Sequence, residues 1–328
     1  MANQIVSSNK IGLVLVNLGT PDSPETPDVK KYLRQFLSDP RVIESPKFIW
    51  WFILNGGILP YRSSKSAEKY QTVWQHEGSP IRLLGESLVK KLSDTLDSQK
   101  FQVKLAMTYG QPAIGDVISQ LLAEGIEDIR VIPLYPQYSA TTTAPVYDQI
   151  GKFLQSQRNL PSLRILRNYC DDKNYHVAMA NCIRQHWETE GKGEKLIFSY
   201  HGIPKKYADK GDPYPQECYR TSLGIAKQLN LQKNEWETCF QSRFGPAEWL
   251  QPYLSDRMSQ LPAENIKKID VVAPSFACDC LETLEEIKME AQEMFLAAGG
   301  EEFRYVEALN DSDLHVDLII QLLQQRLS

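Results

Sequence analysis

The sequence predicts an α/β protein of two similar Rossmann-like halves, each with a parallel four-stranded sheet in flavodoxin-like order. Short runs rich in β-branched residues alternate with longer helical patterns, which is typical of βαβ units. The chain also repeats itself, because Ser119–Val131 matches Ser259–Val271 at eight of thirteen positions. Its 328 residues suit about two domains, on a prior of roughly 150 residues each. Together these observations indicate a duplicated unit.

The expected strands fall into two sets of four. Continuous apolar runs such as Leu13–Val16 and Val271–Ala273 are expected to be buried on both faces of a parallel sheet. A related helix is expected to close each half, beginning at Tyr175–Val177 in the first copy and at Leu314–Val316 in the second. The strands are expected over 12–18, 103–108, 129–134 and 163–168, and then over 195–200, 237–241, 269–273 and 303–306.

The two copies are expected to form two domains. The first covers 1–170, the second covers 171–312 and carries the reactive groups, and the helix over 313–328 is expected to be able to pack back on the first. The first copy has about 43 extra residues between its first and third strands, most of them an apolar, tryptophan-containing insertion over about 44–80, here named the lip. An insertion after the carboxyl end of a strand lies on the ligand side of an open α/β sheet, so the lip is expected to cover a cleft.

Composition excludes several classes of function. A net charge of −5 without a dense basic run argues against nucleic acid as a partner. Apolar runs stay short of the ~20 residues that a membrane-spanning helix needs. Six cysteines without a CxxC pair indicate reduced thiols in a cytosolic protein. The motifs GxGxxG, GxxxxGK[ST] and GxSxG are absent, which weakens dinucleotide, nucleotide-hydrolase and serine-hydrolase interpretations.

The repeat places ionisable residues opposite inert ones. A second alignment of the halves sets Leu18 opposite His201, and the first alignment sets Thr142 opposite Glu282. In the expected strand order, the first and third strands are neighbours at the topological switch point, where ligands bind. His201 and Glu282 are therefore expected to meet at one cleft of the second half.

A histidine paired with a carboxylate can bind a borderline divalent metal such as Fe²⁺ and can accept protons near neutral pH. Two ligands are too few for a tight structural metal site, so His201 and Glu282 suit a metal in transit. Glu286, one turn further along a helix, is a candidate third ligand, while Glu290 and Glu293 are expected to face solvent. The apolar face of that helix is expected to consist of Leu284, Ile287, Ala291 and Met294.

Aromatic residues gather just beyond the expected strand ends. There they could clasp a large, flat ligand, although most buried aromatic residues belong to a core. Cys278 and Cys280 are interpreted as small buried hydrophobes. The aromatic residues concerned are Tyr109, Tyr135, Tyr138, Tyr200, Trp249 and Phe276.

At these residues the chain resembles the ferrochelatases over essentially its whole length. The matching stretches are Val16–Pro21, Tyr135–Ser139, Gly211–Glu217 and Cys280–Leu284. The resemblance implies a chelatase-like fold around a porphyrin cleft. The implied reaction inserts Fe²⁺ into protoporphyrin IX and releases two protons, which is the last step of haem biosynthesis.

The resemblance also implies roles for residues. The catalytic histidine of the family falls on His201 and its cleft glutamate on Glu282; which of them takes protons and which passes metal stays open. Iron is implied as a substrate, with no resident cofactor. No iron–sulfur cluster is expected, because the chain ends at Ser328 without a cysteine-rich extension and Ala140 occupies one common internal ligand position. Porphyrin contacts are implied for Leu18, Arg62, Lys65, Tyr70, Tyr109, Tyr135, Trp249 and Phe276, with Arg62 facing a propionate.

Location and alternatives complete the expectations. The protein is expected in the cytoplasm, with an optional peripheral contact between residues 48–60 of the lip and the inner face of a membrane. Oligomeric state stays open. The alternatives are a chelatase for another metal or tetrapyrrole, a porphyrin or haem carrier without turnover, and a glycosyltransferase with two Rossmann-like domains.

Overall fold

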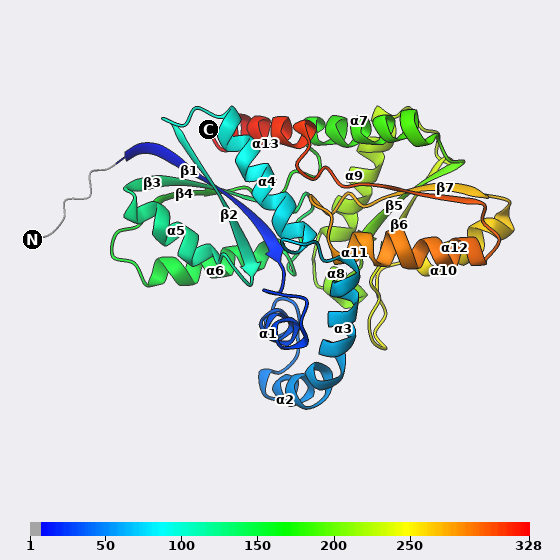
Figure 1. Cartoon of the computed structure of the whole chain (residues 1–328), viewed down its shortest axis with the longest axis horizontal. Coiled ribbons are helices and arrows are strands. Elements are labelled where there is room, and N and C mark those ends of the chain that lie inside the picture. The colour runs from blue at the N-terminus through cyan, green and yellow to red at the C-terminus, as the bar shows by residue number, and fades with distance from the viewer. Residues whose placement is uncertain (1–7) are drawn as a thin grey trace, which may run out of the picture. The chain divides into compact units, whose positions relative to one another are not determined.

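The computed structural model describes residues 8–328, which divide into two compact units (Figure 1). The first unit runs to Tyr135 and includes Ser139–Asn168 and Ile319–Ser328, and the second contains Pro136–Tyr138 and Tyr169–Leu318. The first set of elements is β1 (Ser8–Gly19), α1 (Thr26–Leu37), α2 (Lys47–Ile53), the π-helix η1 (Leu54–Ile58), α3 (Leu59–Val73), α4 (Pro80–Thr95), β2 (Phe101–Tyr109), α5 (Ile114–Ala123), β3 (Ile126–Pro133), α6 (Thr143–Gln155) and β4 (Ser162–Ile165). The second set is α7 (Lys173–Glu190), β5 (Lys195–His201), α8 (Lys205–Asp209), α9 (Tyr214–Gln228), β6 (Trp236–Gln241), α10 (Leu254–Gln260), the 3₁₀-helix η2 (Leu261–Glu264), β7 (Lys268–Val272), α11 (Leu281–Leu284), the π-helix η3 (Glu286–Ala291), α12 (Gln292–Ala297), β8 (Glu302–Val306) and α13 (Asp313–Arg326).

Both units contain a four-stranded sheet with the predicted strand order. The first sheet runs β2-β1-β3-β4 and the second β6-β5-β7-β8, and all neighbouring strands are parallel. All eight predicted strands are present, with ends that shift by a few residues. The largest shift is at the start of β1, which begins at Ser8. Strand β4 ends early, at Ile165, although the next amide, Leu166 N, still donates to Val131 O over 2.9 Å.

The duplication holds at the level of strand register. Gly12 pairs with Ile129 in the first sheet, and their aligned partners Lys195 and Ile269 pair in the second. Since register fixes which side chains share a face, the two copies present equivalent positions at the ends of their strands.

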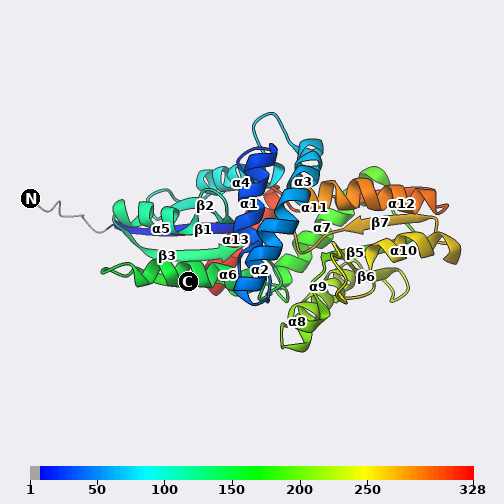
Figure 2. The same cartoon turned by 90° about the horizontal axis from the view of Figure 1, so that it is seen from below.

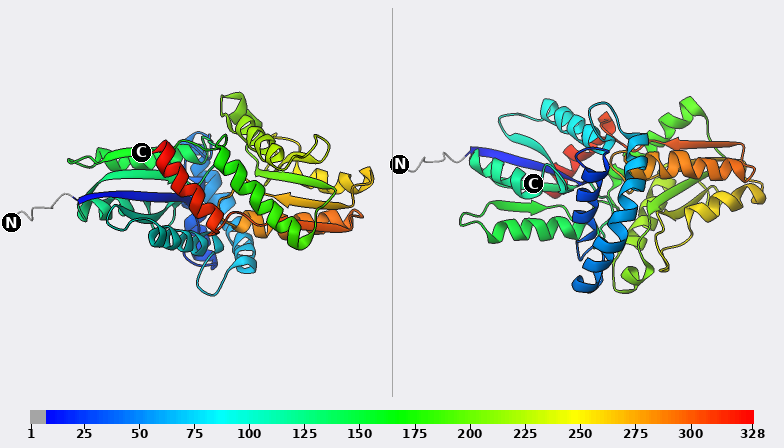
Figure 3. Two further views of the ribbon diagram at one scale, coloured as in Figure 1. Left: turned by 90° about the horizontal axis from the view of Figure 1, so that it is seen from above. Right: turned by 60° about the horizontal axis from the view of Figure 1, so that its bottom comes forward.

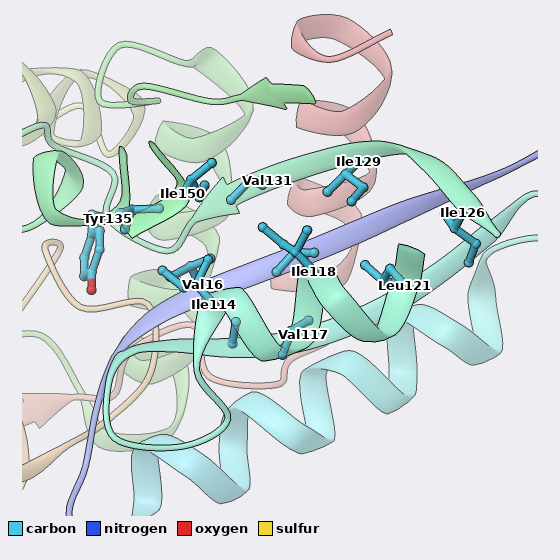
Figure 4. Packing of buried hydrophobic residues seen from close by; sticks show 13 residues of the cluster. Val16, Ile114, Val117, Ile118, Leu121, Ile126, Ile129, Val131, Tyr135 and Ile150 are labelled. Carbon is cyan, nitrogen blue, oxygen red and sulfur yellow. The ribbon is translucent and has the colours of Figure 1, made fainter. Parts of the chain in front are cut away.

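Helices cover both faces of each sheet. In the first unit, α4 lies on one face and α5 and α6 on the other; in the second unit, α7 and α9 lie opposite α10 and α12 (Figures 1 and 3). The buried residues of α5 recur at spacings of three and four, which places Ile114, Val117, Ile118 and Leu121 on one stripe. Figure 4 shows this stripe against side chains of the first sheet, including Ile129 and Val131.

The lip is helical and is fixed at its base within the first unit. It consists of α2, η1 and α3, and α3 packs beside α1 (Figure 2). Trp50 Nε1 donates to Leu37 O over 2.6 Å, and Tyr109 Oη donates to Asp39 Oδ2 over 2.9 Å. The first bond ties the start of the lip to the end of α1, and the second ties the end of β2 to the segment between α1 and the lip.

The acidic helix of the second unit is not the regular α-helix that was predicted. It is split into α11, η3 and α12, and within η3 Glu290 N donates to Glu285 O, five residues back, over 2.9 Å. The wider turn changes the register. Ile287, Ala291 and Phe295 are fully buried, and Met294, predicted for this face, is 37% exposed.

Candidate active site

His201 is the last residue of β5, and its ring orientation is set by the turn that follows. Its Nδ1 lies 2.7 Å from Gly202 O. A carbonyl oxygen only accepts hydrogen bonds, so Nδ1 carries the hydrogen of the neutral ring. Nε2 then bears the lone pair that can accept a proton or bind a metal.

Gly202 allows two neighbouring segments to approach His201. Gly202 N donates to Gln241 O over 2.9 Å. A Cβ atom at position 202 would lie 2.9 Å from that same oxygen and 3.2 Å from Trp249 Cε3. The ring of Trp249 lies 6.5 Å from that of His201, and its Nε1 donates to Phe244 O over 2.8 Å. The missing side chain thus lets β6 and the Trp249 loop close on the histidine.

Glu282 lies in the first turn of α11. The buried carboxylate of Asp279, just before this helix, anchors the turn. Asp279, 4% exposed, accepts hydrogen bonds from Thr283 Oγ1 at 2.8 Å, Tyr305 Oη at 2.5 Å and Asn310 Nδ2 at 2.7 Å. Three donors satisfy this buried charge, which would otherwise be strongly destabilising. The network holds the turn that carries Glu282.

Gln241 links the histidine strand to both glutamates. It is the register partner of His201, and its Nε2 donates to Glu282 O over 2.7 Å and to Glu286 Oε2 over 3.3 Å. Its Oε1 accepts from Ser199 Oγ at 2.6 Å. Sequence reasoning missed Gln241 because it looked like an ordinary strand end. The available signal was its place beside His201 at the sheet edge.

Glu286 has a raised pKa. Burial is the largest cause, and the neighbouring Glu282 charge raises the pKa further, whereas His201 and hydrogen bonds from Ser242 and Gln241 lower it. The charges of both His201 and Glu282 therefore act on Glu286. The structure thus brings the three predicted reactive side chains together in the second unit.

This arrangement is not a metal cage. Among residues 8–328, no group of three or more His, Cys, Asp or Glu side chains is placed to hold a metal ion. Cys278 and Cys280 lie close by in sequence but are buried, and burial raises the pKa of both thiols.

The other aromatic candidates of the second unit differ in exposure. Trp249 and Phe276 are half-buried, and Phe276 packs against the core of the unit. Tyr138 is also half-buried, and its backbone N–H donates to Glu217 Oε2 over 2.7 Å. Tyr200 is fully buried with its hydroxyl 2.9 Å from Ser222 Oγ, which agrees with the alternative that it belongs to the core.

In the first unit, Tyr109 and Tyr135 are buried at the end of β2 and after β3. The hydroxyl of Tyr109 donates to Asp39, and that of Tyr135 lies 3.3 Å from Thr108 Oγ1. Burial raises the pKa of both phenols, which stay protonated. Porphyrin contact by these residues stays a prediction.

Four further candidates lie in β1 and α3 of the first unit. Leu18, in β1, is half-buried and packs against the core. On α3, Tyr70 is buried and packs edge-on against Tyr32, Arg62 is half-buried, and Lys65 is exposed. Lys65 and Arg62 are thus accessible in part or in full to an anionic group.

Comparison with known proteins gives one consistent family. The family model described as Ferrochelatase matches residues 10–327. A ferrochelatase from Janthinobacterium sp. (strain Marseille) is 46% identical over 98% of this chain and 88% of its own length. One from Vibrio parahaemolyticus serotype O3:K6 is also 46% identical, over 98% of this chain and 99% of its own.

Solved structures support the fold. The sirohydrochlorin chelatase SirB from Bacillus subtilis subspecies spizizenii, in complex with cobalt, superimposes with a TM-score of 0.56. It is 11% identical and the match covers 96% of this chain and 94% of SirB. CbiX, described as the terminal enzyme for biosynthesis of sirohaem in denitrifying bacteria, gives a TM-score of 0.52 at 14% identity, over 97% of this chain and all of CbiX. The chain therefore has a chelatase-like α/β fold.

Proposed function

The chain belongs to the ferrochelatase family, and from that premise we propose that His201 and Glu282 carry out the chemistry of the family in it. Its reaction is the insertion of Fe²⁺ into protoporphyrin IX, which forms protohaem and releases two protons; the enzyme is a lyase of haem biosynthesis. The observation that supports the site is the orientation of His201, whose Nδ1 is held by Gly202 O, beside Gln241, which donates to the backbone oxygen of Glu282 and to the carboxylate of Glu286.

We assign His201 the role of proton acceptor. Each pyrrole N–H that binds iron must lose its proton while the nitrogen keeps the electron pair for the metal. Because Nδ1–H is held by Gly202 O, the ring presents Nε2 as the base. One proton goes to Nε2, and a carboxylate of the pair Glu282 and Glu286 takes the second.

We assign Glu282 and Glu286 the passage of ferrous iron. A carboxylate is a suitable ligand for Fe²⁺, and the charge of Glu282 raises the pKa of Glu286. A divalent cation between them relieves that repulsion, and release to the porphyrin restores it. Relief of this repulsion therefore favours binding of the cation.

The family resemblance supports a set of porphyrin-binding residues. A guanidinium pairs well with a carboxylate, so we assign Arg62 to a propionate, with Lys65 as a second cation. Leu18, Trp249 and Phe276 would contact the ring. Tyr70, Tyr109 and Tyr135 are proposed as further porphyrin-binding residues. Binding energy from these contacts can distort the ring so that its nitrogen lone pairs become accessible.

We also propose that the lip contacts a membrane surface from the cytoplasmic side. Phe48, Ile49, Trp51, Phe52 and Ile53 of α2 are between 47% and 75% exposed, and a group of neighbouring exposed apolar residues is a common mark of a protein or membrane interaction site. No helix within residues 8–328 is long and apolar enough to span a bilayer. All six cysteines are free thiols, which suits a reducing compartment.

Vesicle flotation tests the membrane contact. The variant Phe48→Ser with Trp51→Ser should lose co-flotation with phospholipid vesicles. Leu160→Ser is the control, since Leu160 is 59% exposed outside the lip. Equal flotation of wild type and the lip variant would contradict the contact.

We propose that the protein carries no iron–sulfur cluster. Such a cluster is held by cysteine thiolates, usually four. The donor set does not fit, because no metal-holding group of three was found in the described range 8–328 and burial raises the pKa of all six thiols.

Paired substitutions at equivalent positions test the site. His201→Ala should nearly abolish anaerobic Fe²⁺ insertion while porphyrin binding, measured by fluorescence quenching, stays close to wild type. Leu18→Ala, at the matched position of the other copy, should change packing or substrate fit only. Equal loss of binding and turnover in both variants would contradict the assignment. Porphyrin binding without turnover by the wild-type protein would instead indicate a carrier.

A further inference from the structure

Ser242 has a backbone conformation that serine rarely adopts. It follows the end of β6, and its φ of 64° lies in the left-handed region. That region favours glycine and asparagine, so serine there carries a conformational penalty. A residue retained in this conformation is a candidate for a specific task of its side chain.

The hydroxyl of Ser242 is directed at Glu286. Ser242 Oγ donates to Glu286 Oε2, and Gln241 Nε2 donates to the same oxygen over 3.3 Å. Gln241 is itself oriented, because its Oε1 accepts from Ser199 Oγ at 2.6 Å. Both bonds reach Oε2 and neither reaches Oε1. Together they fix the rotation of the carboxylate about its last bond and direct Oε1 away from the two donors.

We propose that Ser242 and Gln241 form a carboxylate cradle that positions Glu286 to receive Fe²⁺ through Oε1. The proposal rests on the function assigned to Glu286 above. Ser242 is then a positioning residue, since it acts on iron through the glutamate. A preoriented carboxylate binds the cation without first losing rotational freedom, so the cradle lowers the iron concentration that turnover needs.

Substitution by glycine separates the hydroxyl from the backbone. Ser242→Gly removes Oγ but accepts the left-handed conformation, whereas Ser242→Ala removes Oγ and keeps the strain. Loss of a hydrogen bond to a charged group corresponds to about a tenfold effect. In anaerobic assays we expect both variants to raise KM for Fe²⁺ about tenfold, with kcat within about twofold and KM for protoporphyrin unchanged.

A rescue variant and a remote control complete the series. Ser242→Asn restores a donor in a residue that tolerates this conformation, so it should recover most of the iron affinity. Asn265→Gly is the matched control, because Asn265 has the same φ of 64° after η2. It should leave both KM values at the wild-type level.

A double-mutant cycle tests whether Ser242 acts through Glu286. In the Glu286→Gln background, Ser242→Gly should add little to KM for iron, whereas independent residues would give additive effects. Wild-type iron dependence in Ser242→Gly, or additivity in the double variant, would overturn the cradle. The proposed function is tested separately. It would be contradicted by turnover in His201→Ala, regardless of the result for Ser242→Gly.

Discussion

His315 should make the stability of the fold sensitive to acid. Its side chain is 1% exposed, Nδ1 lies 2.5 Å from Asn310 O, and Nε2 is buried without a hydrogen-bond partner. Burial lowers the pKa of this imidazole to about 4, against effects of Asn310 and Asp311 that raise it. A protonated ring would place an unsatisfied N–H in the interior, so the folded state keeps the ring neutral.

The magnitude follows from the two pKa values. The unfolded chain binds the proton with a pKa near 6.5 and the folded state with a pKa of about 4. Because the folded pKa of a histidine is lowered, stability is fully present above pH 6.5 and is lost as the pH falls toward 4. The difference amounts to about 3 kcal/mol once the pH is below 4, and to about 2 kcal/mol at pH 5.

The variant His315→Asn removes this titration and keeps the local bond. The Asn Nδ2 can take the place of Nδ1 and donate to Asn310 O. The free energy of unfolding is measured with urea at pH 7, 6, 5 and 4. Between pH 7 and pH 4 it should fall by about 3 kcal/mol less in His315→Asn than in the wild type. The control His76→Asn changes an exposed histidine of the first unit and should follow the wild-type curve. Parallel curves for wild type and His315→Asn would refute the reasoning.

Three further outcomes are expected. Glu286→Gln should change the relative rates with Fe²⁺, Zn²⁺ and Co²⁺ more than the exposed Glu290→Gln does; identical metal profiles in an anaerobic absorbance assay would count against the role of Glu286. Gly202→Ala should lower kcat at least tenfold with the fold intact by circular dichroism, because its Cβ would lie 2.9 Å from Gln241 O and displace the loop beside His201. Ile118→Ala should destabilise the first unit by about 2–5 kcal/mol, as a fully buried side chain is removed; a loss below about 1 kcal/mol in denaturant titration would contradict the packing in Figure 4.

The strands and their order could be predicted because they depend on signals that the sequence carries directly. Apolar runs such as Leu13–Val16 mark strands buried on both faces, and the repeated segments fix which strands are equivalent. Strand equivalence then places His201 and Glu282 at neighbouring strand ends. These inferences need no knowledge of individual side-chain contacts.

Other features depend on tertiary packing and could not be predicted. The wide turn of η3 exchanges Met294 for Phe295 in the core, and the periodicity of the sequence is compatible with either. Tyr200 sits beside His201 in the sequence yet points into the core, since neighbouring residues of a strand face opposite sides. Gln241 and Ser242 form hydrogen bonds to residues that lie more than forty positions further along the chain. Nothing local in the sequence marks such bonds.

The equivalence of Gly12–Ile129 and Lys195–Ile269 has an evolutionary consequence. When one chain contains two copies of a structural unit, one copy can change while the other keeps the original fold. Here one copy carries the apolar lip after its first strand, and the other has His201 at the end of the equivalent strand. Because the two features lie in different copies, the apolar surface of the lip and the surroundings of His201 can change independently of one another.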